Sequence, residues 1–149
     1  MKVIEYFTSE NKEHWLSQIK KSDWGAAQWL HDLLKKNELF ALIGEKTRVL
    51  MLVDDDELLS FCTLAEKDDI QPMDLTPWIG WLYTFPTHRG KRLAGVLISH
   101  AEDLAKSDGA SYVHISTNHI GLYEKYGYEF FKTMKDVEGE DSRVYRKKI

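Results

Sequence analysis

A cluster of cations and glycine near residue 90 is the first stretch of the sequence that could do chemistry. Residues 89–92 read Arg-Gly-Lys-Arg, and they lie at the start of the helical apolar pattern of residues 91–107. The first turn of a helix has unpaired N–H groups and carries roughly half a positive charge, so it attracts anions. A glycine such as Gly90 lets an anion approach the backbone closely. The pattern predicts a phosphate site, and a plain solvated helix start is the alternative.

Other phosphate-binding and metal-binding motifs are absent. Gly90 and Gly95 have the G-x-x-x-x-G spacing, but Val96 follows where a P-loop requires lysine. The sequence contains neither G-x-G-x-x-G nor H-E-x-x-H. A generic nucleotide-binding module therefore stays open as an alternative, and no metal site is predicted.

A second segment, downstream of the first, indicates which kind of anion the predicted phosphate site binds. "WLYTFPTHRGKRLAG" begins at Trp81, and "NHIGLYEKYGYEF" begins at Asn118. In this order and spacing the two segments resemble the GCN5-related N-acetyltransferases (GNAT). That family has R/Q-x-x-G-x-G/A for the pyrophosphate of acetyl-CoA, followed by a pattern like L-Y-E-K-x-G-F. The resemblance covers about residues 78–131 and implies an enzyme that moves an acetyl group from acetyl-CoA to an amine. A sensor or regulatory domain that binds acyl-CoA without turnover is the runner-up.

The resemblance also implies the residues that bind acetyl-CoA. Backbone groups of two residues on the central strand would contact the pantetheine, the helix start would hold the diphosphate, and an asparagine would contact the pantetheine or cap the next helix. These residues are Leu82, Thr84, Arg89, Gly90, Lys91, Arg92, Leu93, Ala94 and Asn118. The chain departs from the family at position 92, where an arginine replaces a glycine. Its side chain would either crowd the diphosphate or point outward toward the 3′-phosphate.

Acetyl transfer to an amine needs a neutral amine, a stabilised carbonyl oxygen and a proton for the departing thiolate. An alkylamine of pKa about 10.4 is neutral in only roughly one molecule per thousand at pH 7. Tyr123 matches the family tyrosine that protonates the thiolate, although periodicity alone makes it a packing residue. The strand segment "PWIGWLYTF" has no carboxylate where many relatives carry a glutamate. The candidates for the base are Tyr83, His114, or a water chain from Asp69 or Asp74.

The acceptor is expected to be cationic, either a small molecule or a peptide amine. By the resemblance, segments 20–25, 66–74 and 135–142 surround its site. The last two segments hold many carboxylates and only two lysines. A cleft lined by charges of one sign concentrates ligands of the opposite charge. Trp24, Trp78 and Trp81 could add aromatic walls for an ammonium group. The carboxylates are Glu66, Asp68, Asp69, Asp74, Asp136, Glu138, Glu140 and Asp141. Loops that are charged only for solubility are the alternative.

Composition limits the classes of function and of cellular location that remain open. The 149 residues carry a net charge of −4, which disfavours a nucleic-acid partner. A single cysteine excludes an intrachain disulfide, and no apolar run approaches the roughly 20 residues of a membrane span. We expect one domain over residues 1–149, located in the cytoplasm without a membrane partner. A homodimer is compatible with the family resemblance.

The elements that must position these residues follow from hydrophobic periodicity. The predicted order is β-α-α-β-β-β-α-β-α-β-β, with a hairpin turn at Asp54–Asp56 and a short helix over 119–126. Strand 77–85, helix 91–107 and strand 111–117 form a parallel crossover unit. The expected fold is α/β, a mixed and mostly antiparallel sheet of about seven strands with helices on both faces.

Overall fold

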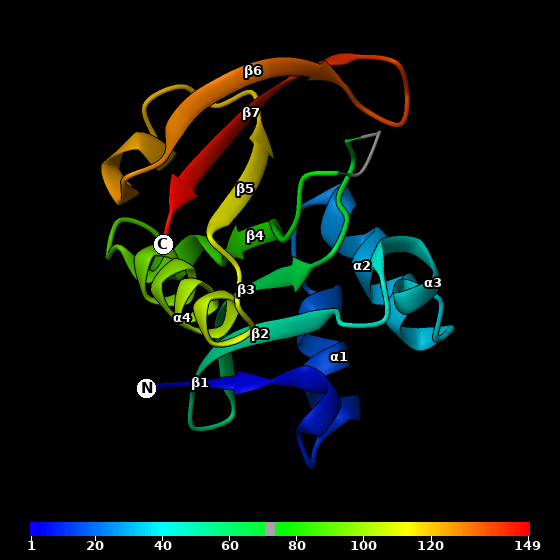
Figure 1. Cartoon of the computed structure of the whole chain (residues 1–149). Coiled ribbons are helices and arrows are strands. Elements are labelled where there is room, and N and C mark those ends of the chain that lie inside the picture. The colour runs from blue at the N-terminus through cyan, green and yellow to red at the C-terminus, as the bar shows by residue number, and fades with distance from the viewer. Residues whose placement is uncertain (71–73) are drawn as a thin grey trace.

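Seven strands form one mixed sheet in the order β1-β2-β3-β4-β5-β7-β6 (Figure 1). The computed structural model describes residues 1–70 and 74–149. Within these residues each neighbouring pair of strands is antiparallel except β4–β5, which is parallel. The strands are β1 (Lys2–Glu5), β2 (Arg48–Asp54), β3 (Glu57–Ala65), β4 (Trp78–Thr84), β5 (Tyr112–Thr117), β6 (Glu129–Lys135) and β7 (Asp141–Lys148).

Helices cover both faces of this sheet because its central strands are apolar on both sides. Along β2, Val49, Met51 and Val53 pack with one group of helices, whereas Leu50 and Leu52 pack with α4 on the other face. The first face holds α1 (Lys12–Lys20), α2 (Gly25–Lys35) and α3 (Leu39–Ile43), and the second holds α4 (Leu93–Ser107). None of the described helices is both long and apolar enough to cross a membrane.

The predicted fold class is confirmed, and the differences are local. The turn at Asp55–Asp56 lies as predicted, whereas the five-residue helix α3 was not predicted. The predicted helix over 119–126 is only a 3-10 turn, η3 (Tyr123–Tyr126), preceded by Gly121 at φ 91°. Asn118 is therefore not its N-cap, which is Leu122. Helix α1 begins after Asn11, and the Ser9 hydroxyl donates to the carbonyl of Tyr6 rather than capping that helix.

The path of β4 creates an opening in the middle of the sheet. The register with β3 shifts between Phe61↔Tyr83 and Thr63↔Gly80, and Trp81 in this bulge has φ 48°. In the described residues, β4 and β5 share one register pair, Trp78↔His114, beyond which the strands diverge (Figure 1). Bulges bend a strand and end its regular pairing. The result is a wedge between two parallel strands that opens toward their carboxyl ends.

Candidate active site

A cavity of about 560 Å³ occupies this wedge and continues toward α2 and α3. This volume is in the range of small-ligand sites. We call it the wedge cavity. Both separated strands contribute to its wall, as do the start of α4, the turn before β6 and the loop after β3. Its lining includes Ile79, Gly80, Trp81, Leu82, Thr84, Arg89, Ala94, Ile115, Ser116, Thr117, Leu122, Tyr123, Asp68 and Asp69.

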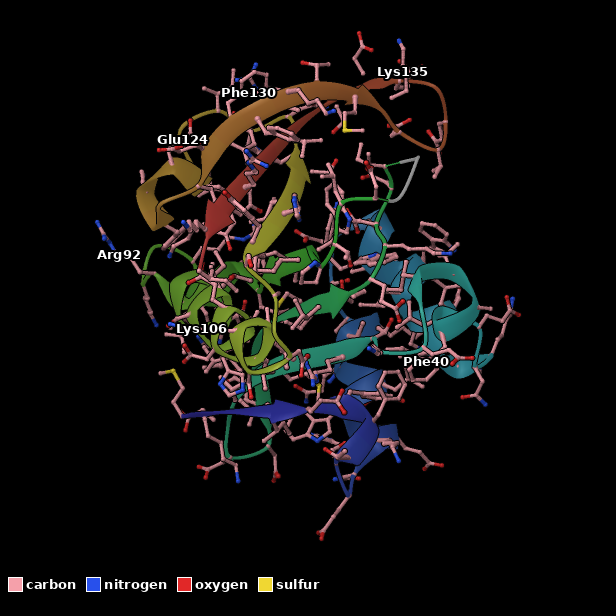
Figure 2. The ribbon with its side chains drawn as sticks, in the orientation of Figure 1. Phe40, Arg92, Lys106, Glu124, Phe130 and Lys135 are labelled. Atoms are coloured by element: carbon pink, nitrogen blue, oxygen red, sulfur yellow. The ribbon has the colours of Figure 1, made fainter. Side chains whose placement is uncertain are left out.

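The start of α4 lies at one end of the wedge cavity and presents free backbone donors. Gly90 has φ 81° and Arg92, the N-cap, has φ 57°, so two left-handed residues turn the chain before the helix. None of the N–H groups of residues 90–94 bonds an acceptor within the described part of the chain. The Arg92 side chain points away from the molecule (Figure 2). This loop can bind an anion through its backbone, and the Arg92 side chain does not obstruct it.

Arg89 is folded back onto β4 rather than extended beside the helix start. Its Nε donates to the carbonyl of Thr84 at 2.9 Å, and its guanidinium lies 5.4 Å from the ring centroid of Tyr83. A terminal nitrogen also lies 3.7 Å from Asp23. These contacts tie the loop to the end of β4, and Arg89 still lines the wedge cavity.

Among the described residues, Tyr6 and Tyr123 are the buried tyrosines whose hydroxyls have no protein partner, and of these two only Tyr123 lines the wedge cavity. The hydroxyls of Tyr83, Tyr128 and Tyr145 are bonded to Asp23, Glu102 and Arg143 respectively. Among the described residues none bonds the Tyr123 hydroxyl, and no buried side-chain polar atom is left unpaired, so this oxygen faces the open cavity. Burial, with smaller effects of Cys62 and Asp68, raises the pKa of Tyr123 to about 12. The phenol therefore keeps its proton at neutral pH and is available as a donor.

Asp68 enters the wedge cavity from the loop after β3 and lies over Gly80. A Cβ atom at position 80 would collide with Asp68 Oδ1, so the carboxylate occupies the space of the missing side chain. Burial and the charge of Asp69 raise the pKa of Asp68 well above its usual value. No ion pair among residues 1–70 and 74–149 involves either aspartate. The two carboxylates form the acidic part of the cavity.

Comparison with known proteins decides what this arrangement is. The model of the acetyltransferase (GNAT) family matches residues 7–128. The chain belongs to the GNAT family. Members of this family use acetyl-CoA, and the protein is accordingly an acetyl-CoA-dependent N-acetyltransferase, as predicted from the two sequence segments. The sequence matches none of the curated proteins with which it was compared at a significant level.

Solved structures share the GNAT fold with this chain at low sequence identity. The aminoglycoside 6′-N-acetyltransferase from Enterococcus faecium has a TM-score of 0.70 and 16% identity, over 99% of this chain and 97% of that one. An acetyltransferase from Streptococcus agalactiae has a TM-score of 0.65 and 19% identity, over 99% and 98%. A GNAT protein from Elizabethkingia anophelis with acetyl-CoA bound has a TM-score of 0.68 and 12% identity, over 99% and 97%. These likenesses concern the fold.

The structure places the predicted residues of this GNAT protein in three groups. Those in the wall of the wedge cavity are Leu82, Thr84, Arg89, Ala94, Tyr123, Asp69 and Trp24. Gly90, Lys91 and Arg92 lie just outside it in the loop before α4, whereas Leu93 is buried in the core. The remaining ones lie elsewhere: Tyr83, His114, Trp78, Asp74 and Asn118 are outside the wall.

Two of the predicted base candidates outside the wall, Tyr83 and His114, are engaged in the fold. The Tyr83 hydroxyl donates to Asp23 Oδ1 at 2.5 Å, and its ring stacks on Trp24. The ring of His114 is buried beside Trp78, and its Nδ1 lies 3.1 Å from the carbonyl oxygen of Pro77. Burial lowers the pKa of His114. Both side chains are thus packed in the fold, and neither lines the wedge cavity.

Aromatic and aliphatic side chains form the wall opposite the helix start. Trp24, Trp29, Leu42 and Val137 line the cavity and remain partly exposed, between 37% and 55%. Trp81 joins them; its indole Nε1 donates to the carbonyl of Ala26, and its ring lies 5.4 Å from Trp29. Trp78, predicted for this wall, is instead fully buried and donates to the carbonyl of Leu75.

Most of the carboxylates predicted around the acceptor lie elsewhere. Of the eight, only Asp68 and Asp69 line the wedge cavity. Asp136 accepts the N–H groups of Glu138 and Glu140 inside its own turn, and Asp141 pairs with Lys135 at 2.6 Å. The turn nevertheless borders the site, because Val137 N–H donates to the carbonyl of Asp69 at 2.7 Å. The acidic character of the site thus comes from one pair of residues.

The backbone at Arg92 allows a test of the loop geometry. Arg92 has φ 57°, and a non-glycine residue in the left-handed region costs about 1–2 kcal/mol. Arg92→Gly should therefore raise the free energy of unfolding by about 1 kcal/mol, since part of the relief is offset by chain entropy. For a chain of this size the midpoint of thermal unfolding should rise by about 2–4 °C.

Arg92→Ala is the matched control for this change. It removes the same exposed side chain but keeps the left-handed backbone strain, so its unfolding midpoint should stay near that of the wild type. A glycine variant that is no more stable than the alanine variant would contradict the φ assigned to residue 92.

Proposed function

We propose that this GNAT enzyme transfers the acetyl group directly to an amine within a ternary complex, with Tyr123 as the general acid. The observation that carries the proposal is the Tyr123 hydroxyl, which has no partner in the described residues and faces the cavity between the separated strands. A hydroxyl that opens onto a cavity takes its hydrogen bond from water or from a bound ligand. Formation of the CoA thiolate creates the acceptor for that proton.

The same cavity has groups that suit acetyl-CoA. The unpaired edges of β4 and β5 leave backbone groups near Leu82 for an extended polar chain such as pantetheine. The free N–H groups of residues 90–94 suit the diphosphate, and Lys91 adds positive charge. Acetyl-CoA supplies the activated thioester, and the chain's own residues hold it and provide the proton at Tyr123 Oη.

The acceptor that fits best is a cationic amine on an apolar body. Asp68 and Asp69 attract the ammonium group. Trp24, Trp29 and Trp81 offer aromatic faces that favour a cation or a flat apolar group. A polycation has less support, because Asp136 accepts backbone N–H groups of its own turn and Asp141 pairs with Lys135. We therefore place arylalkylamines before polyamines and amino acids.

The proposal is tested by thiol release from acetyl-CoA with four acceptors: an arylalkylamine, a polyamine, lysine and glutamate. The arylalkylamine should give the highest kcat/KM, and glutamate should give the lowest because the acidic pair repels it. The advantage of cationic acceptors should fall as salt is raised, since exposed charges are screened within about 10 Å at 0.1 M.

The control variant for this panel is Trp29→Ala. Trp29 is half-exposed on the cavity wall and is not part of the core. The variant should lose activity mainly with the arylalkylamine, through KM. A preference for glutamate would contradict the cationic acceptor. Binding of acetyl-CoA with no thiol release for any amine would favour the non-catalytic sensor instead.

A further inference from the structure

The glycine in the middle of β4 makes room for a carboxylate from another element. β4 is otherwise built from large residues, and a glycine within a strand marks a close approach of another group. At Gly80 that group is the Asp68 side chain, whose Oδ1 would overlap a Cβ atom on the strand. Thr63 on β3 bounds the same space, with its Oγ1 3.1 Å from the same Cβ position.

The Asp68 carboxylate and the Tyr123 hydroxyl belong to one cavity, where a base and an acid are both needed. Both side chains line the wedge cavity, and the charge of Asp68 is one of the causes that raise the pKa of Tyr123. The transfer reaction needs one group that takes a proton from the amine and another that gives a proton to the thiolate. A carboxylate and a phenol facing one cavity meet both needs.

We propose that Asp68 is the general base of this enzyme and that it acts from the loop after β3, in the space that Gly80 leaves on β4. This assignment rests on the proposed transfer to an amine. Asp68 accepts a proton from the ammonium group, and the neutral nitrogen attacks the thioester carbon. The C–N bond forms and the C–S bond breaks, while Tyr123 protonates the sulfur. The nitrogen loses two protons overall. One of them passes through Asp68 to solvent, and the other replaces the proton that Tyr123 gave to the sulfur.

The surroundings of Asp68 suit this role. The charged neighbour of Asp68 is Asp69 on the same loop, and no cation contributes to the pKa of Asp68. Tyr123 on η3 lines the same cavity. The raised pKa of Asp68 lies closer to the pKa of an ammonium group, so Asp68 is a stronger base than an exposed aspartate. Activity should therefore fall as pH drops through this raised pKa, because the protonated acid cannot accept a proton.

The test compares Asp68→Asn with the wild type across pH, using the best amine of the panel. At pH 7 the variant should lose about 100-fold in kcat, the lower part of the range for positioned acid–base groups. The loss should shrink toward pH 10, where about a third of an alkylamine of pKa 10.4 is already neutral. The acidic limb of the wild-type profile should be absent from the variant.

Asp69→Asn is the matched control, since it removes the same charge from the same cavity but not from the space over Gly80. Because Asp69 also attracts the ammonium group, its loss should raise KM for the amine. The variant should nevertheless retain the acidic limb and move it to lower pH, because the charge of Asp69 raises the pKa of Asp68. A kcat of Asp68→Asn within threefold of an active wild type would overturn the proposal, and so would a loss that is equal at pH 7 and pH 10. Absence of wild-type turnover would instead count against the proposed transfer itself.

Discussion

Replacing Tyr123 with phenylalanine should lower kcat by about 10²–10⁴ while leaving the affinity for acetyl-CoA nearly unchanged. The ring keeps its packing, including the edge contact with Tyr128 at 6.5 Å between centroids, so the fold is retained. What is lost is the proton for the departing thiolate. Since the pKa of Tyr123 is raised to about 12, the wild-type profile should show no loss from its ionisation below pH 10. Single-turnover measurements separate this chemical step from product release.

Tyr126→Phe is the matched control for Tyr123. Tyr126 lies on the same short turn, η3, but its ring packs against Gly95 of α4 and does not line the wedge cavity. Its loss should leave the single-turnover rate unchanged. Equal rates for the wild type and both variants would return Tyr123 to a packing role.

Gly90→Glu should weaken acetyl-CoA binding by about 10- to 1,000-fold. A carboxylate near the diphosphate meets like charge, and such a pair at about 4 Å costs roughly 1–4 kcal/mol between the limits of bulk water and a protein surface. Nothing in the protein lies within 4 Å of a Cβ at this position, so the side chain extends into the space before α4. The measurement is a titration of acetyl-CoA at low and high salt, where the penalty should shrink with salt.

Gly90→Gln separates charge from shape. It has the same size as glutamate and carries the same strain at φ 81°, but it does not repel an anion. Its affinity should lie much closer to that of the wild type. If both variants bind acetyl-CoA equally, whether weakly or well, the diphosphate does not lie at residues 90–94.

Local sequence patterns predicted the scaffold well and the positions of the residues on the acceptor side poorly. The crossover from β4 through α4 to β5 and the loop before α4 follow from periodicity, glycine and charge over neighbouring positions. The approach of Asp68 to Gly80 joins two elements across a loop, and no short pattern encodes it. The available signal was the glycine itself, which interrupts a strand of tryptophan, leucine and tyrosine.

The positions of the histidine and tyrosine candidates were hard to predict for a related reason. His114 and Tyr83 have side chains that can titrate, but which face of a strand a residue occupies depends on the bulge in β4 and on the partners of β5. That bulge gives Trp81 a positive φ, which is unfavourable for a bulky residue such as tryptophan. The positions of the cavity walls therefore depend on tertiary packing, which residue type alone does not predict.

The single register pair between β4 and β5 in the described residues also affects how the protein holds together. Strands β1–β4 and strands β5–β7 form two units that meet along a seam with little backbone bonding, so the apolar core that they share does most to join them there. A pantetheine chain lying in that seam would act as an added strand and join the two units. By mass action, a ligand at 100 times its Kd adds about 2.7 kcal/mol to stability. The lifetime of the folded enzyme would then follow the supply of its acetyl donor.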